Sequence, residues 1–473
     1  MDEVFEKRGG FVVEILIGVL LLLTFFGLAY YCIKGHNLMI GFLVITIIWT
    51  VLPLVGTLFA SPEFLAENEV LRFDGLEDLI TNTLNGIYQS APEGWGTTLV
   101  NVCWGAWFGR VLMETGIAST LIRKTVELGG DRPVITMALL NVVTAIIFTA
   151  MTGAGPVIAI GVIVLPILMS LGIPKGIALF SFMESVAAGI YLNPVNFAQY
   201  RAFFVDVNEM PDFNLSWYFG RWGIWALLIA LVLTTIIAGF ALSRSKTSHA
   251  WAASAPSGEV KDAPFYTLIL PIVPVVLNIA LKFSVIGGFV IAGFAALFLC
   301  GKMKGGFVAS CQLVNKLYYD GVVDTAPLVG FLLTLPMFNK VASLASPYFK
   351  SVLGSVMPRT ELVVCIVFAI LAALGLFRGP LTLVGCGAAT LGVLSNVATF
   401  SVPFLYCVFA IPTITGNIGS CITQSWVAWG LAYTKVESKD YLKLSIPTTY
   451  IISAVLYVLT MFTMSGLGEA WIK

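Results

Sequence analysis

Residues 152–176 read TGAGPVIAIGVIVLPILMSLGIPKG, and residues 377–394 read FRGPLTLVGCGAATLGVL. Each stretch places a Gly-Pro pair inside a long apolar run, and the two runs extend over 134–171 and 360–394. The Gly-Pro pair cuts each run into halves of about 15 to 18 residues, fewer than the about 20 residues that a helix needs to cross a bilayer. We therefore predict two re-entrant helical hairpins, each of which enters and leaves the membrane on the same side.

Two further apolar runs, 176–206 and 397–434, are interrupted by polar clusters. The first contains NPVN at 193–196 and the second contains TITGNIGS at 413–420. Non-helical backbone at membrane depth is tolerated only where protein or a wet cavity satisfies its amide groups. We predict a broken helix in each run. For each break taken alone, a proline kink in an ordinary span is the alternative.

The composition is typical of a membrane protein. Of the 473 residues, 58% are apolar and 11% are charged, whereas charged residues make up about a quarter of a soluble protein. The 26 basic residues are balanced by 26 acidic ones, so a nucleic acid is not expected as a partner. The two histidines, His36 and His249, lie in polar connectors, and no zinc site or His-based catalytic site is expected in the apolar body. We expect no enzymatic activity and no cofactor. The clearest continuous spans are 11–33, 38–60, 217–242, 265–281, 284–300 and 441–465.

Two short motifs occur twice, in the same order. GIYQSAP at 86–92 matches GVVDTAP at 321–327, and GPVIAIG at 155–161 matches GPLTLVG at 379–385. In each half, two spans, an amphipathic connector, a third span, a hairpin, a broken span and a closing span follow one another. Because a hairpin returns to its own side, each half crosses five times, and an odd number of crossings inverts the second half relative to the first.

The predicted fold class is therefore an all-α polytopic membrane protein with two inverted repeats. It comprises about 10 transmembrane helices, two re-entrant hairpins and two broken helices. The first repeat covers 1–242, a linker covers 243–264 and the second repeat covers 265–473. The distribution of Lys and Arg favours both termini on the outer side of the membrane, periplasmic or extracellular, and the linker in the cytoplasm. We expect a multi-pass protein of the cell's inner membrane, with the lipid bilayer around it.

The two hairpin tips and the two breaks are predicted to meet near the membrane midplane. Helices that stop there present free N–H groups and positive dipole ends, which stabilise an anion. Freed carbonyls, with Thr and Asn side chains, can coordinate Na⁺. The candidate substrate-binding residues are Thr152, Gly153, Ala154, Gly155, Asn193, Asn196, Arg378, Gly379, Thr415, Gly416, Asn417 and Ser420. The candidate Na⁺ ligands are Thr152, Asn193, Thr415 and Asn417.

Two ionisable residues are predicted at depth. Arg378 lies between a long apolar run and Gly-Pro. It either binds a substrate carboxylate bidentately or, at a shallower tip, reaches lipid headgroups or pairs structurally with an acid. Glu184 precedes the first break, and it is either a proton carrier or a structural carboxylate that accepts hydrogen bonds. Both alternatives remain open for each residue.

The layout resembles the ion transporter superfamily, which includes divalent anion/sodium symporters, gluconate permeases, citrate transporters and anaerobic C4-dicarboxylate carriers. The resemblance lies in GAGPVIAIGVIVLPILMSLGIPKG at 153–176, FRGP at 377–380 and ITGNIGSCITQSWVAW at 414–429, and it is closest to the gluconate-permease and C4-dicarboxylate-carrier side. It implies cation-coupled uptake of a small organic anion by an elevator motion, in a homodimer.

Sodium-coupled members carry a Ser-Asn-Thr signature at the tip and at the break. This chain has Thr152-Gly153-Ala154 and Thr415-Gly416-Asn417 there, a departure that leaves room for protons. The resulting prediction is a symporter for a carboxylate or sugar acid, coupled to H⁺ or Na⁺. A cation/proton antiporter of the same superfamily is the alternative, and a channel or an intramembrane enzyme fits the pattern less well.

Overall fold

The computed structural model describes residues 2–34, 36–130, 132–205, 209–245, 262–354, 358–385 and 387–472. Every element assigned in these ranges is a helix. Among the described residues, four helices are long and apolar enough to cross a membrane, or up to six if each of two bent pairs counts as one span. The predicted class, an all-α polytopic membrane protein, is confirmed.

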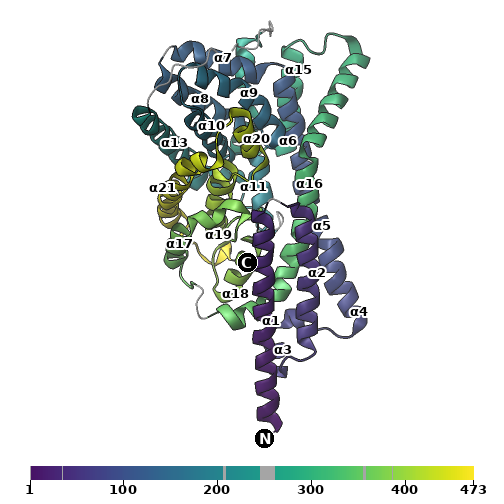
Figure 1. The fold of residues 1–473 in the computed structure, drawn as a ribbon. Coiled ribbons are helices and arrows are strands. Elements are labelled where there is room, and N and C mark those ends of the chain that lie inside the picture. The colour runs from purple at the N-terminus through teal and green to yellow at the C-terminus, as the bar shows by residue number, and fades with distance from the viewer. Residues whose placement is uncertain are drawn as a thin grey trace.

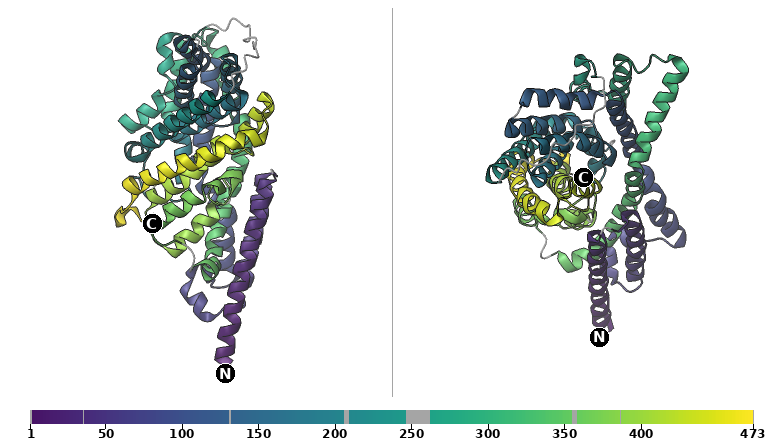
Figure 2. Two further views of the ribbon diagram at one scale, coloured as in Figure 1. Left: turned by 60° about the vertical axis from the view of Figure 1, so that its left-hand side comes forward. Right: turned by 45° about the horizontal axis from the view of Figure 1, so that its top comes forward.

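One group of helices surrounds the longest helix, α16 (Gly306–Leu353), which packs against α1 (Asp2–Ile33), α2 (Leu38–Thr57) and α6 (Gly96–Glu114). Figures 1 and 2 show α1 reaching far beyond the rest of the molecule, with α2 and the lower half of α16 beside it. The contact between α1 and α16 is close because Gly18 has no side chain. A Cβ atom there would lie 2.5 Å from the carbonyl oxygen of Tyr348.

A second group contains the hairpins and broken helices. Its centre is α10 (Lys175–Ile190), which packs against α8 (Pro133–Phe148), α9 (Ala154–Ser170), α13 (Ile224–Arg244) and α21 (Ser438–Met464). Every residue from Ile177 to Ile190 of α10 is buried. Such complete burial is expected of a helix that is enclosed by other helices rather than by lipid.

The remaining elements complete these two groups. They are α3 (Pro62–Glu67), η1 (Glu69–Leu71), α4 (Leu76–Asp78), η2 (Leu79–Leu84), η3 (Gly86–Ser90), α5 (Ala91–Gly94), α7 (Ile117–Gly129), α11 (Pro194–Arg201), α12 (Leu215–Tyr218), η4 (Phe219–Gly223), η5 (Phe265–Ile269), α14 (Val273–Leu281), α15 (Val285–Leu299), α17 (Glu361–Ile370), η6 (Ala372–Arg378), α18 (Gly387–Val397), α19 (Val402–Ile411), η7 (Pro412–Ser420), α20 (Ser425–Thr434) and η8 (Glu469–Trp471).

The structure corrects two expectations about the second half. The predicted span 265–281 is not one helix, because η5 ends at Ile269 and α14 starts at Val273. Pro271 and Pro274 lie at this interruption, where the missing N–H groups prevent a continuous helix. The expected connector and third span are also not separate, since both belong to α16.

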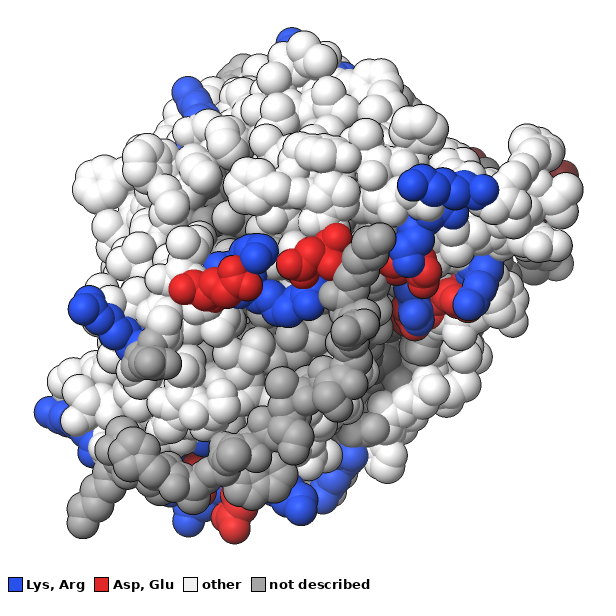
Figure 3. All heavy atoms as spheres, turned by 90° about the horizontal axis from the view of Figure 1, so that it is seen from above, with Lys and Arg blue, Asp and Glu red and all other residues white. Residues whose placement is uncertain are grey.

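Residues 246–261 of the predicted linker 243–264 lie outside the described residues. The described flank of this linker is anchored to α7, where Asp262 pairs with Arg123 and the Ala263 amide donates to Thr120 Oγ1 at 2.9 Å. Seen from above, this end of the molecule carries basic and acidic side chains next to one another on a largely uncharged surface (Figure 3). The inverted relation of the two halves stays a prediction.

Candidate functional site

The first hairpin tip is a short turn between two helices. α8 ends at Phe148 and α9 begins at Ala154, and Gly153 adopts a φ of 97°, which favours glycine. The next pair, α10 and α11, is bent by 67° across residues 191–193. The first hairpin and the first broken helix are therefore present as predicted.

Asn193 joins the first tip to the first break. Its Oδ1 accepts hydrogen bonds from the amides of Val195 and Asn196 at 3.0 and 3.2 Å, which caps α11. Its Nδ2 donates to the carbonyl oxygens of Phe148 and Met151 at 3.0 and 3.1 Å. One side chain thus satisfies backbone groups of two interrupted helices.

The second hairpin tip has a different local structure. α17 and η6 are bent by 65°, and Phe377 and Arg378 have φ values of 56° and 57°. The chain is then non-helical from Gly379 to Gly385, and α18 begins only at Gly387. The prediction of two short helices of about 15 to 18 residues over 360–394 is wrong in length, because α17, η6 and α18 are each shorter. The reason is a loop that folds on itself, because a Cβ atom at Gly385 would lie 2.3 Å from the carbonyl oxygen of Arg378.

The second break is also different from its prediction. Residues Pro412–Ser420 form a π-helix, which continues from α19 without a sharp bend, and the chain leaves helical geometry only at 421–424. The prediction that the helix is broken at 413–420 is therefore wrong, because these residues form a π-helix. A π-helix widens the backbone while keeping it hydrogen-bonded, and such segments occur frequently at functional sites.

Hydrogen bonds connect all four elements. Tyr191 at the first break shares a 2.7 Å hydrogen bond with Thr415 of the π-helix. The Leu383 amide of the second tip donates to Thr413 Oγ1 at 3.0 Å. Arg378 Nη2 donates to Gln424 Oε1 at 2.9 Å. The two tips and the two interrupted helices thus form one connected centre.

A cavity of about 610 Å³ lies at this centre. Six of the twelve predicted substrate-binding residues line it: Thr152, Gly153, Ala154, Asn196, Arg378 and Asn417. Apolar and aromatic walls come from Phe148, Val157, Val186, Ile190, Tyr200, Val384, Ile418 and Trp426. Its volume is within the range of small-molecule sites.

Two asparagine side chains in this cavity have unused hydrogen-bonding atoms. Asn417 is fully buried, and neither its Oδ1 nor its Nδ2 has a hydrogen-bond partner among the described residues. Asn196 donates through Nδ2 to Tyr200, whereas its buried Oδ1 accepts nothing from that part of the chain. Buried polar atoms are nearly always paired, so these amides are available to a ligand that enters the cavity.

The other six predicted residues do not line the cavity. Asn193 and Thr415 use their side chains in the hydrogen bonds described above, and Ser420 donates to Glu184. The three glycines allow close approach between chain segments. Their missing Cβ atoms would meet Asp324 at Gly155, the Leu374 carbonyl oxygen at Gly379 and the backbone of Gly375 at Gly416.

The carbonyl groups at the breaks are occupied by side-chain donors. Tyr218 donates to the Tyr191 carbonyl at 3.0 Å, and Trp426 donates to the Ile418 carbonyl at 3.0 Å. Tyr441 donates to the Gly419 carbonyl. Of the four predicted Na⁺ ligands, only Thr152 and Asn417 line the cavity. The predicted set does not form one coordination sphere here.

Glu184 lies behind the π-helix rather than in the cavity lining. It is 1% exposed and accepts a hydrogen bond from Ser420. Its carboxyl group also packs on Gly419, where a Cβ atom would lie 2.7 Å from Oε2. Ser420 in turn accepts from Thr449 at 2.9 Å. Glu184 therefore touches the π-helix two and three residues beyond Asn417.

The sequence analysis missed Asp324 as a site residue. Asp324 lines the cavity from α16 and receives two hydrogen bonds from Arg110, both of 2.6 Å. The repeated motif was a signal for it, because Asp324 is the central residue of GVVDTAP. Gln199 and Gln424 also line the cavity, as do His36 and Asn37 of the α1–α2 connector.

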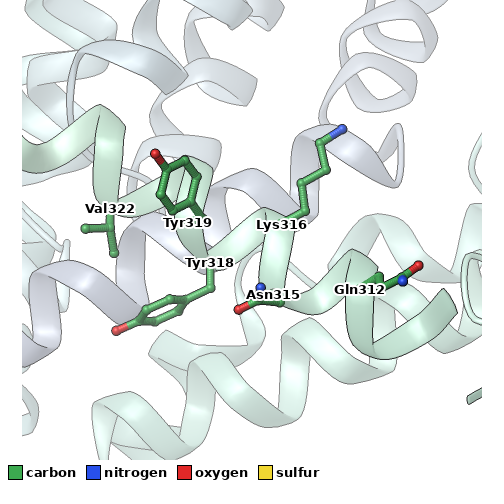
Figure 4. A pocket seen from close by; sticks show the side chains of 6 residues that line it. All are labelled: Gln312, Asn315, Lys316, Tyr318, Tyr319 and Val322. Carbon is green, nitrogen blue, oxygen red and sulfur yellow. The ribbon is translucent and has the colours of Figure 1, made fainter. Parts of the chain in front are cut away.

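A second pocket, of about 450 Å³, lies elsewhere, on the N-terminal half of α16 (Figure 4). Its lining residues are Gln312, Asn315, Lys316, Tyr318, Tyr319 and Val322. All of them come from one helix, and none belongs to a tip or a break. We therefore regard the central cavity as the candidate functional site.

Comparisons with known proteins identify the fold. No family model matches the chain, and no curated protein matches it in sequence. Solved structures with a similar architecture include the following two. The YdaH transporter of Alcanivorax borkumensis is 13% identical with a TM-score of 0.57, over 90% of this chain and 98% of that one. MtrF of Neisseria gonorrhoeae, described with a class of antimetabolite efflux pumps, is 13% identical with a TM-score of 0.55, over 84% of this chain and 85% of that one. The chain thus has the fold of two membrane transporters.

Proposed function

We propose that this protein is a secondary active transporter that moves an organic anion across the inner membrane, coupled to protons. The observation that carries the proposal is the central cavity, where both hairpin tips and both interrupted helices meet and where the amide of Asn417 has no partner among the described residues. Interrupted helices that meet in this way are the usual site of substrate and coupling ion in secondary transporters.

The chemistry of the cavity favours an anion. The guanidinium of Arg378 lines it, and a guanidinium binds carboxylates with two parallel hydrogen bonds. The N-terminus of α9 also reaches the cavity at Ala154, where the free N–H groups of a helix favour negative charge. The apolar walls and the volume allow a ligand larger than a small dicarboxylate.

Protons are favoured over sodium as the coupling ion. The carbonyls at 191, 418 and 419 are already used by Tyr218, Trp426 and Tyr441, which leaves fewer oxygen ligands for a hard cation. Glu184, by contrast, is a buried carboxyl group next to the segment that carries Asn417. Intramembrane carboxyl groups in such positions form proton relays in transporters.

The proposal has four further points. The protein belongs to the ion transporter superfamily, and the hairpin group moves against the α16 group in an elevator motion. The anion and the proton cross in the same direction, by symport, and the protein is a homodimer. The structural neighbour MtrF is described with efflux pumps, so export by proton exchange is the second candidate.

Flux measurements in proteoliposomes test the proposal. Labelled organic anions, including aromatic carboxylates, are offered under a proton gradient, a sodium gradient or neither. We expect accumulation driven by the proton gradient. Accumulation only when the proton gradient is reversed would favour export, and accumulation driven by sodium alone would contradict proton coupling. Absence of any gradient-driven flux would contradict secondary transport.

Glu184→Gln tests the coupling residue. The amide keeps the size of the carboxyl group and can still accept from Ser420, but it cannot exchange a proton. We expect the substitution to abolish the pH dependence of uptake while exchange between labelled and unlabelled anion continues. An unaltered pH profile would remove Glu184 from the coupling.

A further inference from the structure

Asp324 and Arg110 form an ion pair at the edge of the cavity. Arg110 Nε donates to Oδ2 and Arg110 Nη2 donates to Oδ1, both at 2.6 Å. The side chains are 29% and 16% exposed, for Arg110 and Asp324 respectively. A bidentate pair of this kind fixes the orientation of both side chains as well as their separation.

The carboxyl group of Asp324 lies directly on the first hairpin tip. A Cβ atom at Gly155 would be 2.4 Å from Oδ2, 2.6 Å from Cγ and 3.0 Å from Oδ1. The methyl group of Thr325 approaches the tip at Gly153, 3.7 Å from where a Cβ atom would lie. The tip therefore rests on two consecutive residues of α16.

The helix that carries Arg110 touches the same tip. A Cβ atom at Gly109 would lie 3.5 Å from Pro156 and 3.6 Å from Met151, ordinary contact distances. α6 and α16 also cross closely nearby, because a Cβ atom at Gly321 would lie 2.9 Å from the backbone of Ala106 and Trp107. The ion pair thus joins the two helices at the place where the tip meets both.

The first copy of the motif shows that its structural role does not require an acid. The residue that corresponds to Asp324 is Gln89, which is exposed and donates to Glu93. The acid at 324 therefore serves its local surroundings, namely Arg110 and Gly155.

We propose that Asp324 and Arg110 are positioning residues that hold the first hairpin tip in its ligand-binding arrangement at the cavity. The pair acts through Gly155 on Thr152 and Ala154, which line the cavity. This inference rests on the proposed function and extends it, because two residues of the α16 group would then contribute to the affinity for the ligand.

Amide hydrogen exchange of residues 149–156 tests the proposal on purified protein without any substrate. The variants are Asp324→Asn, Arg110→Gln, the double variant and Gly155→Ala, with Gln89→Ala as the matched control. We expect each single change to raise exchange at the tip by about tenfold, because charge-assisted hydrogen bonds are lost. The double variant should exchange no faster than the single ones, since it leaves no uncompensated charge.

Gly155→Ala keeps both charges and displaces the carboxyl group. We expect it to reproduce the faster exchange at the tip, and Gln89→Ala to leave the tip unchanged. A tip that exchanges at the wild-type rate in both Asp324→Asn and Gly155→Ala would overturn the proposal. So would a double variant whose effect equals the product of the two single effects.

A flux measurement separates positioning from a general loss of structure. In proteoliposomes, Asp324→Asn should raise the apparent KM for the anion several-fold more than it lowers the maximal rate, and the double variant should recover part of the affinity. Equal losses in both parameters would contradict positioning. If the wild type shows no flux, the proposed function fails, while the exchange measurement still decides on the ion pair.

Discussion

The two hairpin tips carry the same GP-x-x-x-x-G motif but have different structures. At the first tip the motif lies in a regular helix, and its glycines face other elements, with Asp324 beside Gly155 and Trp429 beside Gly161. At the second tip the motif is a non-helical loop that closes on its own backbone, with Gly385 against Arg378. The glycines of the first tip therefore pack on neighbouring elements, whereas those of the second tip pack on the tip's own backbone.

The two tips also differ in the charged groups that they bring to the cavity. The first tip meets a carboxyl group that Arg110 already neutralises. The second tip carries its charge on the loop, where Arg378 adopts a left-handed backbone conformation that is unfavourable for a residue with a side chain. Such strain is maintained where the surroundings fix it, and it is common at ligand sites. Under the proposed function, the carboxylate of the anion would bind at the guanidinium of Arg378 in the second tip.

The largest expected effect comes from Arg378→Ala. Without the guanidinium, uptake of the anion should fall by about a hundredfold, because roughly 3 kcal/mol of charge-assisted hydrogen bonding is lost. Flux in proteoliposomes measures this, with Arg359→Ala as a control, since Arg359 is exposed and donates to the Gly354 carbonyl away from the cavity. Wild-type flux in Arg378→Ala would remove the second tip from the site.

Asn193→Ala tests whether neighbours hold the first tip. The substitution removes the cap of α11 and two donors to the carbonyls of Phe148 and Met151. We expect the free energy of unfolding to fall by about 3 kcal/mol, from one cap and two buried hydrogen bonds. Denaturation of the purified protein in detergent measures this. Asn214→Ala, which removes the cap of α12 and one exposed hydrogen bond to the Pro211 carbonyl, should cost about 1 kcal/mol, and equal losses would contradict the special role of Asn193.

Gly385→Ala tests the packing of the second tip on its own backbone. Its new methyl group would meet the backbone of Arg378, which cannot rotate away, and we expect a loss of about 2 kcal/mol in the free energy of unfolding. Gly161→Ala is the counterpart in the repeat, and its new methyl group would meet the Trp429 ring. Because Gly161 lies inside a helix, alanine there gains up to about 1 kcal/mol of helix propensity. Thermal unfolding should therefore show the larger drop for Gly385→Ala. The reverse order would break the comparison.

The smallest effect on stability is expected for Asn417→Ala. Both amide atoms of Asn417 lack partners among the described residues, so their removal should change the free energy of unfolding by no more than about 0.5 kcal/mol. The stabilisation that a bound anion gives in a thermal-shift experiment should nevertheless disappear. A large loss of stability without ligand would show that Asn417 is structural.

The sequence predicted the positions of the interruptions better than their form. Gly-Pro and Asn-Pro mark places where a helix cannot continue, because an N–H group is missing and the ring clashes with the preceding turn. The breaks near 153, 193 and 379 follow from this local rule. Residues 412–420 form a π-helix in which Thr413 and Thr415 have hydrogen-bond partners on other segments, and local sequence does not identify these partners.

The same distinction applies to the site. Thr152, Asn196, Arg378 and Asn417 lie where local breaks place them, and they line the cavity. Asn193, Thr415 and Ser420 have the same residue types but are used in tertiary hydrogen bonds. The repeated motif was the only sequence signal for Asp324, since its partner Arg110 is 214 residues away in the chain. Which polar residues remain unused is a property of the assembled fold.

The central claim is that the two tips and the two interrupted helices form one anion site. The most direct test is a high-resolution structure of the protein with a bound organic anion that stabilises it in solution. We predict density in the central cavity, with the anionic group at the guanidinium of Arg378 and a polar group at the amide of Asn417. Density elsewhere, for example at Tyr319 in the pocket on α16, together with an empty central cavity would contradict the account.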